Sequence, residues 1–299
     1  MSTKPLFSVV IPSYNCSKFL ERSLTSVFDQ SFQDVEIIVV DNSSTDDTEK
    51  ILERFATQKL SSVSVQNHGV IAYSRNVGIK QSQGEWIAFL DADDVWLPRK
   101  LEIVCEAIAN NPEAILFCHD EWKVVNNVRK SRNHYGPRLA DCYESLVFCG
   151  GCLSTSATVL RRDIALSSGG FSERRDFITV EDHDYWTRLS RLGSFHFIEE
   201  VLGEWHIHSE NASGSSEVHA RAVIAVGEYH LAEWLKEHPE SERRVKMRSG
   251  MLLSGASRIF LRNRDFRRAR AYALQAIPKD PLNWKTWVSL FLATARIGI

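Results

Sequence analysis

The sequence predicts an α/β fold, a mostly parallel sheet flanked by helices, followed by an all-helical C-terminal extension. Short apolar, β-branched runs such as Phe7–Pro12 and Val35–Val40 alternate with amphipathic stretches at helical spacing. This alternation is typical of βα units joined by right-handed crossovers. From Glu217 onward the strand signal disappears and helix-like segments follow one another. We therefore expect an α/β domain over residues 1–212 and a helical extension over residues 213–299.

Composition narrows the class of protein. The chain has 299 residues, of which 43% are hydrophobic and 25% charged, as in ordinary soluble globular proteins. The formal net charge of −2 argues against a nucleic-acid partner. The first residues lead directly into a strand without a secretory signal, so a cytoplasmic location is expected. The six cysteines suit reduced thiols better than a disulfide framework.

The order of the remaining elements follows from local patterns. Ser44 with Asp47 suggests a capping box that opens the second helix. Asn126–Pro137 is polar and is expected to be a mobile loop that carries specificity. Further strands are expected at Trp86–Leu90, Ala114–Val125, Ser154–Leu160, Phe195–Val201 and Leu202–His208.

Three carboxylates follow the most apolar of these strands. Asp91, Asp93 and Asp94 come directly after Trp86–Leu90, a run that reads as a strand buried on both faces. Ligands of open α/β sheets bind at the carboxyl ends of strands, where crowded carboxylates repel one another unless a cation joins them. Mg²⁺ or Mn²⁺ fits such oxygen ligands. The alternative is an acidic start to the helix opened by Pro98, and the short motif alone leaves both open.

A second acidic cluster opens a later helix. Glu181, Asp182 and Asp184 precede an apolar helical face that includes Trp186. Carboxylates in a first helical turn interact favourably with the helix dipole, so a structural role competes with a catalytic one.

Taken in order, these motifs resemble family 2 glycosyltransferases of the GT-A fold, over residues 6 to about 212. The resemblance implies a nucleotide-binding half at about 1–110 and an acceptor-binding half at about 111–212. The combination is more specific than any single motif. The motifs that carry it are Val10–Asn15, Ile38–Asp46, Ser74–Gly78, Leu90–Asp94, Glu181–Trp186 and His206–His208.

The resemblance implies roles for the donor side. Pro12, Tyr14 and Asn15 match the turn that packs on the nucleotide base and ribose. Asp41 matches the carboxylate that reads the base edge, and Arg75 matches the basic group near the donor.

It also implies the reacting groups. Asp91 matches the first carboxylate of the Asp-x-Asp motif, near the ribose, and Asp93 matches the metal ligand. His208 lies where many members keep a histidine near the metal or diphosphate, although His206 is only one strand repeat away. Asp182 matches the catalytic base, with Glu181 beside it.

The implied activity is an inverting, metal-dependent hexosyl transfer with Mn²⁺ or Mg²⁺. The expected donor is a nucleoside-diphosphate sugar, a UDP-sugar first of all. The acceptor is a saccharide, a lipid-linked glycan or a protein. A sugar-1-phosphate nucleotidyltransferase is the alternative, but Ile11–Asn15 lacks the glycine-rich phosphate loop it needs. A catalytically inactive binding or scaffold protein is the second alternative. Such a protein should have lost a base or a metal ligand, but every expected carboxylate is present.

The C-terminal stretch leaves two interpretations open. Arginines are frequent from Arg243 to Arg270, and Leu282–Ile299 holds Trp284 and Trp287 on an apolar helix. The pattern favours a helix packed on the rest of the chain. An interfacial helix in peripheral contact with the inner face of the membrane is the alternative.

Overall fold

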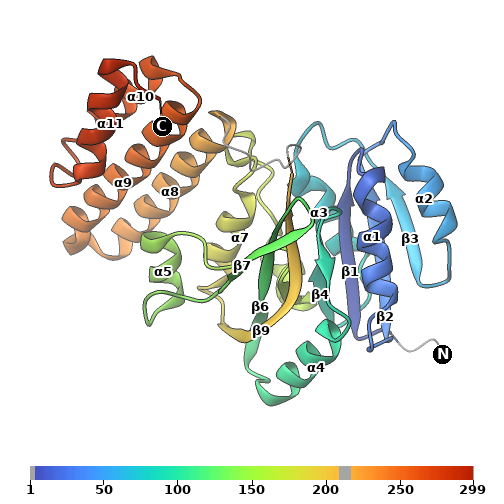
Figure 1. The fold of residues 1–299 in the computed structure, drawn as a ribbon. Helices are drawn as coiled ribbons and strands as arrows, with labels where there is room; N and C mark the ends of the chain where they lie inside the picture. The colour runs from blue at the N-terminus through green and yellow to red at the C-terminus, as the bar shows by residue number, and fades with distance from the viewer. Residues whose placement is uncertain (1–3, 209–216, 299) are drawn as a thin grey trace. The chain divides into compact units, whose positions relative to one another are not determined.

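The computed structural model describes residues 4–208 and 217–298, in two compact units (Figure 1). The first unit consists of Met1–Leu146, Gly151–Glu173 and Arg188–Ser209. The second consists of Val147–Gly150, Arg174–Thr187 and Glu210–Ile299. The contacts thus group residues 174–187 with the C-terminal helices. The domain boundary near residue 212 stays a prediction.

The first unit contains a nine-stranded mixed sheet with the order β3-β2-β1-β4-β8-β6-β9-β5, and β7 pairs with β6. Strands β1, β2, β3 and β4 run parallel to one another, as crossovers through helices require. Beyond β4, strand β8 runs antiparallel and makes the sheet mixed. The strands are β1 (Phe7–Ser13), β2 (Val35–Asp41), β3 (Leu60–Ser64), β4 (Trp86–Phe89), β5 (Val95–Trp96), β6 (Ala114–Val125), β7 (Val128–Asn133), β8 (Thr158–Arg161) and β9 (Ser194–Ile207).

Helices cover both faces of the parallel part. Alternate residues of β1, β2 and β4 pack with α1, α2 and α4 in one buried cluster. On the opposite face, α3 lies so close to β1 that a Cβ on Gly78 would overlap the side chain of Val10. The helices of this unit are α1 (Ser17–Phe28), α2 (Thr48–Arg54), α3 (Ile71–Gln81), α4 (Lys100–Asn110) and α6 (Arg162–Ser167); α5 (Cys142–Cys149) and α7 (Glu181–Leu189) belong partly to each unit.

The prediction of a mobile loop over residues 126–137 is wrong for the centre of this range. Residues Val128–Asn133 form β7, which pairs antiparallel with β6 after a turn in which Asn126 and Asn127 have φ of 52° and 57°. Asparagine tolerates this left-handed region, which a tight hairpin requires. The polarity of the segment reflects its exposure, because every residue of β7 except Asn133 is exposed.

Three local expectations also need correction. The capping box is wrong, because Ser44 bonds to Asp41 and the cap residue Asp47 makes no side-chain cap. The two strands expected over 195–208 are one strand, β9, whose pairing with β6 contains register shifts. Strand β8 begins at Thr158, so residues 154–157 are not part of it.

The second unit is helical. Its helices are α8 (Glu217–Glu237), α9 (Glu242–Arg262), α10 (Phe266–Ala276) and α11 (Trp284–Ala295). The short 3-10 turn Arg175–Phe177 precedes α8 in the chain, and the 3-10 turn Pro239–Ser241 lies between α8 and α9. Small residues such as Ala256, Ala269 and Ala293 let the helices pack around Phe260. Among the described residues, no helix is both long enough and apolar enough to span a membrane.

Candidate functional site

The polar ends of β1, β2 and β4 lie next to one another in the first unit (Figure 1). Ser13 is opposite Asp41 in the β1–β2 register, and Leu90, just before Asp91, donates its N–H to Val10 of β1 at 3.1 Å. Pro12 is buried near the end of β1. The parallel register therefore brings the predicted donor residues to one edge of the sheet.

The turns after β1 and β2 hold each other. Asn15, at φ 48°, donates its N–H to Ser44 Oγ at 2.8 Å, and its Oδ1 accepts the N–H of Thr45 at 2.8 Å. Ser44 in turn donates its N–H and its hydroxyl to the carboxylate of Asp41, at 2.9 and 2.6 Å. Tyr14 is 57% exposed, so its ring is open to stacking on a planar ligand.

The buried cation of the site lies on α3. Arg75 donates to Asp91 Oδ1 at 2.8 Å, and the side chains of the two residues are 5% and 30% exposed. The guanidinium also lies 5.3 Å from the centroid of the Phe171 ring. The predicted basic group is therefore held directly on the first carboxylate of the Asp-x-Asp motif.

The second carboxylate of that motif meets the predicted histidine. His208 Nε2 lies 2.9 Å from Asp93 Oδ2, and the His208 ring stacks on Phe19 with centroids 4.4 Å apart. Burial raises the pKa of Asp93 and the neighbouring charge of Asp91 raises it further, whereas the bond to His208 acts in the opposite direction. His206, the other candidate, lies instead on Glu204 at 3.0 Å.

These donors fit a divalent cation only in part. Among residues 4–208 and 217–298 no group of three His, Cys, Asp or Glu side chains is placed to hold a metal. A carboxylate and an imidazole, Asp93 and His208, do lie together. Mg²⁺ and Mn²⁺ sites commonly take one or two protein ligands and fill the rest with water and substrate phosphate. The pair is compatible with such a shared site.

A third carboxylate, that of Asp94, ties the loop after β4 to the neighbouring segments. Asp94 is buried; its Oδ2 accepts the hydroxyl of Ser156 at 2.5 Å, and its Oδ1 accepts the N–H of His206 at 2.9 Å. Ser156 Oγ also accepts the N–H of Asp91 at 3.1 Å, and its carbonyl accepts Trp96 Nε1–H at 2.8 Å. Burial raises the pKa of Asp94 well above its usual range, and nearby acidic charges add to the effect. No local pattern in the sequence predicts this role of Ser156, because its partner Asp94 is 62 residues away.

Arg22 is a second residue that the sequence analysis missed. It lies on α1, and its guanidinium donates to the backbone carbonyl of Asp93 at 3.1 Å. A lone arginine on the helix after the first strand was the available signal.

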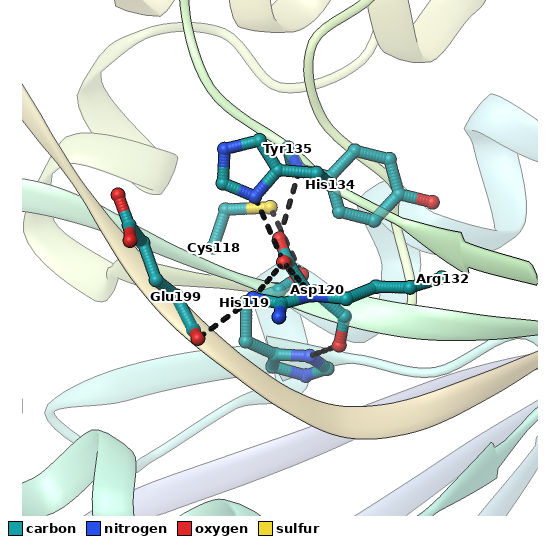
Figure 2. A network of polar contacts seen from close by, with 7 residues as sticks. All are labelled: Cys118, His119, Asp120, Arg132, His134, Tyr135 and Glu199. Carbon is teal, nitrogen blue, oxygen red and sulfur yellow. Dashed lines mark hydrogen bonds and ion pairs between the residues drawn. The ribbon is translucent and has the colours of Figure 1, made fainter.

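A network centred on Asp120 of β6 holds the end of β7 and the two residues that follow it (Figure 2). The buried carboxylate of Asp120 accepts bonds from Arg132 Nε at 2.6 Å, His134 Nδ1 at 2.9 Å and the N–H of Tyr135 at 2.9 Å. Arg132 also donates to the backbone oxygen of Glu199 at 2.8 Å. Burial opposes ionisation of Asp120, but these bonds together lower its pKa. A region expected to be mobile is thus anchored at 132–135.

Behind this network lie buried ionisable groups. Tyr135 donates its hydroxyl to Glu121 Oε2 at 2.9 Å. Lys100 is fully buried, with Nζ 3.4 Å from the centroid of the Trp96 ring. Burial lowers the pKa of Lys100 well below its usual range and raises the pKa of Glu121 to about 7.

Asp182 belongs to the second unit, and its surroundings there distinguish it from its acidic neighbours. Asp184 is buried and lies 3.0 Å from His230 Nε2, so its carboxylate has a structural partner. Glu181 is also buried. Asp182 is the most accessible of the three and accepts the N–H of His183 at 2.7 Å.

Comparison with known proteins identifies the class. The model of the family described as glycosyl transferase family 2 matches residues 8–164, more than half of the chain, so the chain belongs to that family. A relative from Escherichia coli, named UDP-Glc:alpha-D-GlcNAc-diphosphoundecaprenol beta-1,3-glucosyltransferase WfgD, is 31% identical over 62% of this chain and 69% of its own length.

Two solved structures confirm the GT-A fold. TarS 1–349 of S. aureus, in complex with UDP-GlcNAc, superposes with a TM-score of 0.65 at 18% identity, over 99% of this chain and 93% of that one. The mannosyltransferase PcManGT from Pyrobaculum calidifontis, in complex with GDP-Man and Mn²⁺, superposes with a TM-score of 0.60 at 18% identity, over 99% of this chain and 87% of that one. The predicted family and fold class are therefore confirmed, and the protein is a glycosyltransferase.

Replacing Glu121 by Gln should remove one pH dependence of stability. The pKa of Glu121 in the folded protein is about 7, above the unfolded value of 4.5, because burial disfavours its charge. The wild type therefore loses stability relative to Glu121→Gln as the pH rises from about 4.5 to about 7. In urea titrations, the unfolding free energy of Glu121→Gln relative to that of the wild type should increase between pH 5 and pH 8, by on the order of 1–3 kcal/mol.

Glu102→Gln is the matched control. Ser31 and Arg99 lower the pKa of Glu102, so its contribution is lost only as the pH falls below the usual carboxyl range. Its difference from wild type should stay constant over pH 5.5–8. Parallel curves for wild type and Glu121→Gln would contradict the assignment.

Proposed function

We propose that this glycosyltransferase moves a sugar with inversion from a nucleoside-diphosphate donor, a UDP-sugar first of all, to a saccharide or lipid-linked acceptor. The observation that carries the proposal is that the Arg75–Asp91 pair and the Asp93–His208 pair share the short loop that follows β4. TarS with UDP-GlcNAc and PcManGT with GDP-Man support a nucleotide-sugar donor. The name of WfgD supports a glycan acceptor on a lipid diphosphate, as in polysaccharide assembly.

The donor side needs residues that orient a nucleotide and tolerate negative charge. The exposed Tyr14 ring would stack on the base, and Asp41, presented by its bonds to Ser44, would accept hydrogen bonds from the base edge. Arg75, buried on Asp91 at 2.8 Å, would hold that carboxylate in place near the ribose.

Asp93 and His208 would hold Mn²⁺ or Mg²⁺. When bound, the cation supplies Lewis-acid stabilisation of the charge that grows on the leaving diphosphate. The crowding of acids supports this role, because ionising Asp93 beside Asp91 is unfavourable without a positive partner. Phe19 limits rotation of the His208 ring by stacking on it.

The acceptor side needs a base. Asp182 would take the proton of the acceptor hydroxyl while that oxygen attacks the anomeric carbon, so the new bond forms opposite the departing diphosphate. Asp182 suits this role better than Asp184, whose carboxylate is buried on His230. Attack from the side opposite the leaving group inverts the anomeric centre.

Asp93→Asn should cut turnover by about 10³-fold, because an amide removes the negative charge that binds the cation. The protein would first be screened for hydrolysis of a panel of nucleotide sugars with Mn²⁺ and Mg²⁺. Turnover of the selected donor and Mn²⁺ binding, followed by electron paramagnetic resonance, should then both fall in the variant. Asp47→Asn, an exposed carboxylate on the neighbouring turn, is the control. Full transfer in excess chelator would refute the metal role.

Asp182→Asn should lower the transfer rate by about 10² to 10⁴ and leave donor affinity unchanged, since a general base acts only on the acceptor proton. We expect a transfer assay to show this loss of rate, and calorimetry to show unchanged binding of the nucleotide. Asp176→Asn, an exposed acid of the same unit paired with Arg174, should behave as wild type. Equal loss of binding and transfer would make Asp182 structural.

Peripheral contact with an anionic membrane, on its cytoplasmic side, is the second part of the proposal. On α11 the exposed face is apolar: Trp284 and Phe291 are each 67% exposed, and Trp287 and Val288 lie between them at helical spacing. The opposite face buries Thr286, Ser289 and Ala293, which are small or polar. An exposed aromatic stripe with lysine and arginine nearby suits the headgroup layer, where a lipid-linked acceptor would lie.

The triple variant Trp284→Ser, Trp287→Ser, Phe291→Ser should bind anionic vesicles at least 10-fold more weakly than wild type in co-sedimentation, because each exposed ring adds buried apolar area at the interface. Binding of the wild type should weaken with salt. Leu166→Ser with Leu192→Ser, exposed apolar residues of the other unit, is the control. Equal sedimentation of all three proteins would rule out the membrane role of α11.

A further inference from the structure

An open pocket of about 600 Å³ in the first unit is not used by the donor residues described above. Its lining comes from α1, from the β6–β7 hairpin and from the end of β9. Val124 and Val128 of the hairpin give it an apolar part. A volume of this size accommodates a sugar together with a charged substituent.

Arg22 supplies the charge of this pocket. Its NH2 group is fixed on the backbone carbonyl of Asp93 at 3.1 Å, and its Nε is buried without a hydrogen-bond partner among the described residues. Over the same part of the chain its guanidinium forms no ion pair with a carboxylate. A half-buried guanidinium that lacks an anion costs free energy unless a ligand provides one.

The other charged residues of the pocket compensate one another. Glu204 accepts Arg129 Nε at 2.7 Å on one oxygen and lies 3.0 Å from His206 Nε2 through the other. Both oxygens of this carboxylate are therefore engaged, and it does not neutralise Arg22. Among the described lining residues, Arg22 is therefore the cation whose charge is not compensated by a carboxylate.

We propose that this pocket is an acceptor subsite in which Arg22 binds an oxyanion of the acceptor saccharide, a phosphate ester or a carboxylate. The inference rests on the proposed transferase function and adds a substrate class to it. The guanidinium fork binds such oxyanions through two parallel hydrogen bonds, and Nε with one terminal nitrogen forms such a fork.

The position of Arg22 favours the acceptor over the donor as the source of the oxyanion. Arg22 meets Asp93 on its main-chain oxygen, whereas the carboxylate of Asp93 faces His208. The remaining pocket residues come from the β6–β7 hairpin and β9, while Tyr14 and Asp41 follow β1 and end β2. The pocket is adjacent to the reacting loop and made of different elements from the nucleotide side.

The test compares acceptors that share one sugar and differ in charge: a neutral alkyl glycoside, the alkyl ester of the sugar 1-diphosphate, and the glycoside of the matching uronic acid. The wild type should favour one of the anionic forms by KM, and the form chosen tells phosphate from carboxylate. Arg22→Gln should raise KM for that form about 10- to 100-fold and abolish the preference, with the effect on the acceptor KM and not on the donor KM. Arg22→Lys keeps the charge but loses the two parallel hydrogen bonds, so its KM for the anionic acceptor should lie between those of the wild type and Arg22→Gln.

Arg54→Gln, an exposed arginine paired with Glu21, is the matched control and should keep the preference. A wild-type preference for the neutral acceptor, an unchanged acceptor KM in Arg22→Gln, or a rise in the donor KM would each overturn the proposal. Inorganic phosphate binding to the full-length protein, followed by ³¹P NMR, provides a test without transfer. Loss of binding in Arg22→Gln but not in Arg54→Gln supports the subsite, and equal binding overturns it. Absence of donor hydrolysis by the wild type counts against the proposed function, and the phosphate measurement then decides on the subsite.

Discussion

The site depends on keeping several carboxyl groups close together at one strand end. Asp91, Asp93 and Asp94 follow β4 within a few residues. The charge of Asp91 disfavours ionisation of Asp93, and both charges disfavour ionisation of Asp94. The protein treats them differently: Arg75 pairs with the first, His208 meets the second, and the third is buried on neutral donors. Like charges at such distances need this division, because three free carboxylates would push the loop apart.

The division also fixes the shape of the loop. Ser156 connects the carboxyl of Asp94 to the N–H of Asp91 and to Trp96. One residue, just before the antiparallel strand β8, therefore holds both ends of the motif. Buried polar groups are expensive unless each finds a partner, and a satisfied set allows one arrangement. Asp93, between the two fixed acids, is the carboxylate left oriented toward His208.

Exposure separates the functional candidates from their neighbours in the second unit. The acidic opening of α7 looks uniform in the sequence, yet Asp184 is tied to His230 inside the unit and Asp182 is accessible. Helix α11 shows the reverse of the usual pattern, with its aromatic residues outside and its small polar residues packed. This exposed apolar face is the feature that supports the proposed membrane contact.

How much the sequence predicts depends on the range of the interactions. The βα alternation, the burial of β4 and the helix that begins at Glu181 follow from local periodicity and were predicted at nearly their observed bounds. Strand β7 was missed because an exposed edge strand lacks the apolar alternation that marks a half-buried one. The Ser44–Asp47 cap failed because Asp41, at the end of the preceding strand, competes for the same hydroxyl.

By itself, the sequence determined the family, the parallel half of the sheet and the carboxylates that follow its strands, because each depends on neighbouring residues and regular spacing. Only the tertiary structure decided which groups those carboxylates meet. Arg75 on Asp91 joins residues 16 apart, His208 on Asp93 joins residues 115 apart, and Arg22 reaches the same loop from 71 residues away. Such pairs are set by strand order and register, and a hydrogen bond between distant residues leaves no periodic trace in the chain that could reveal it beforehand.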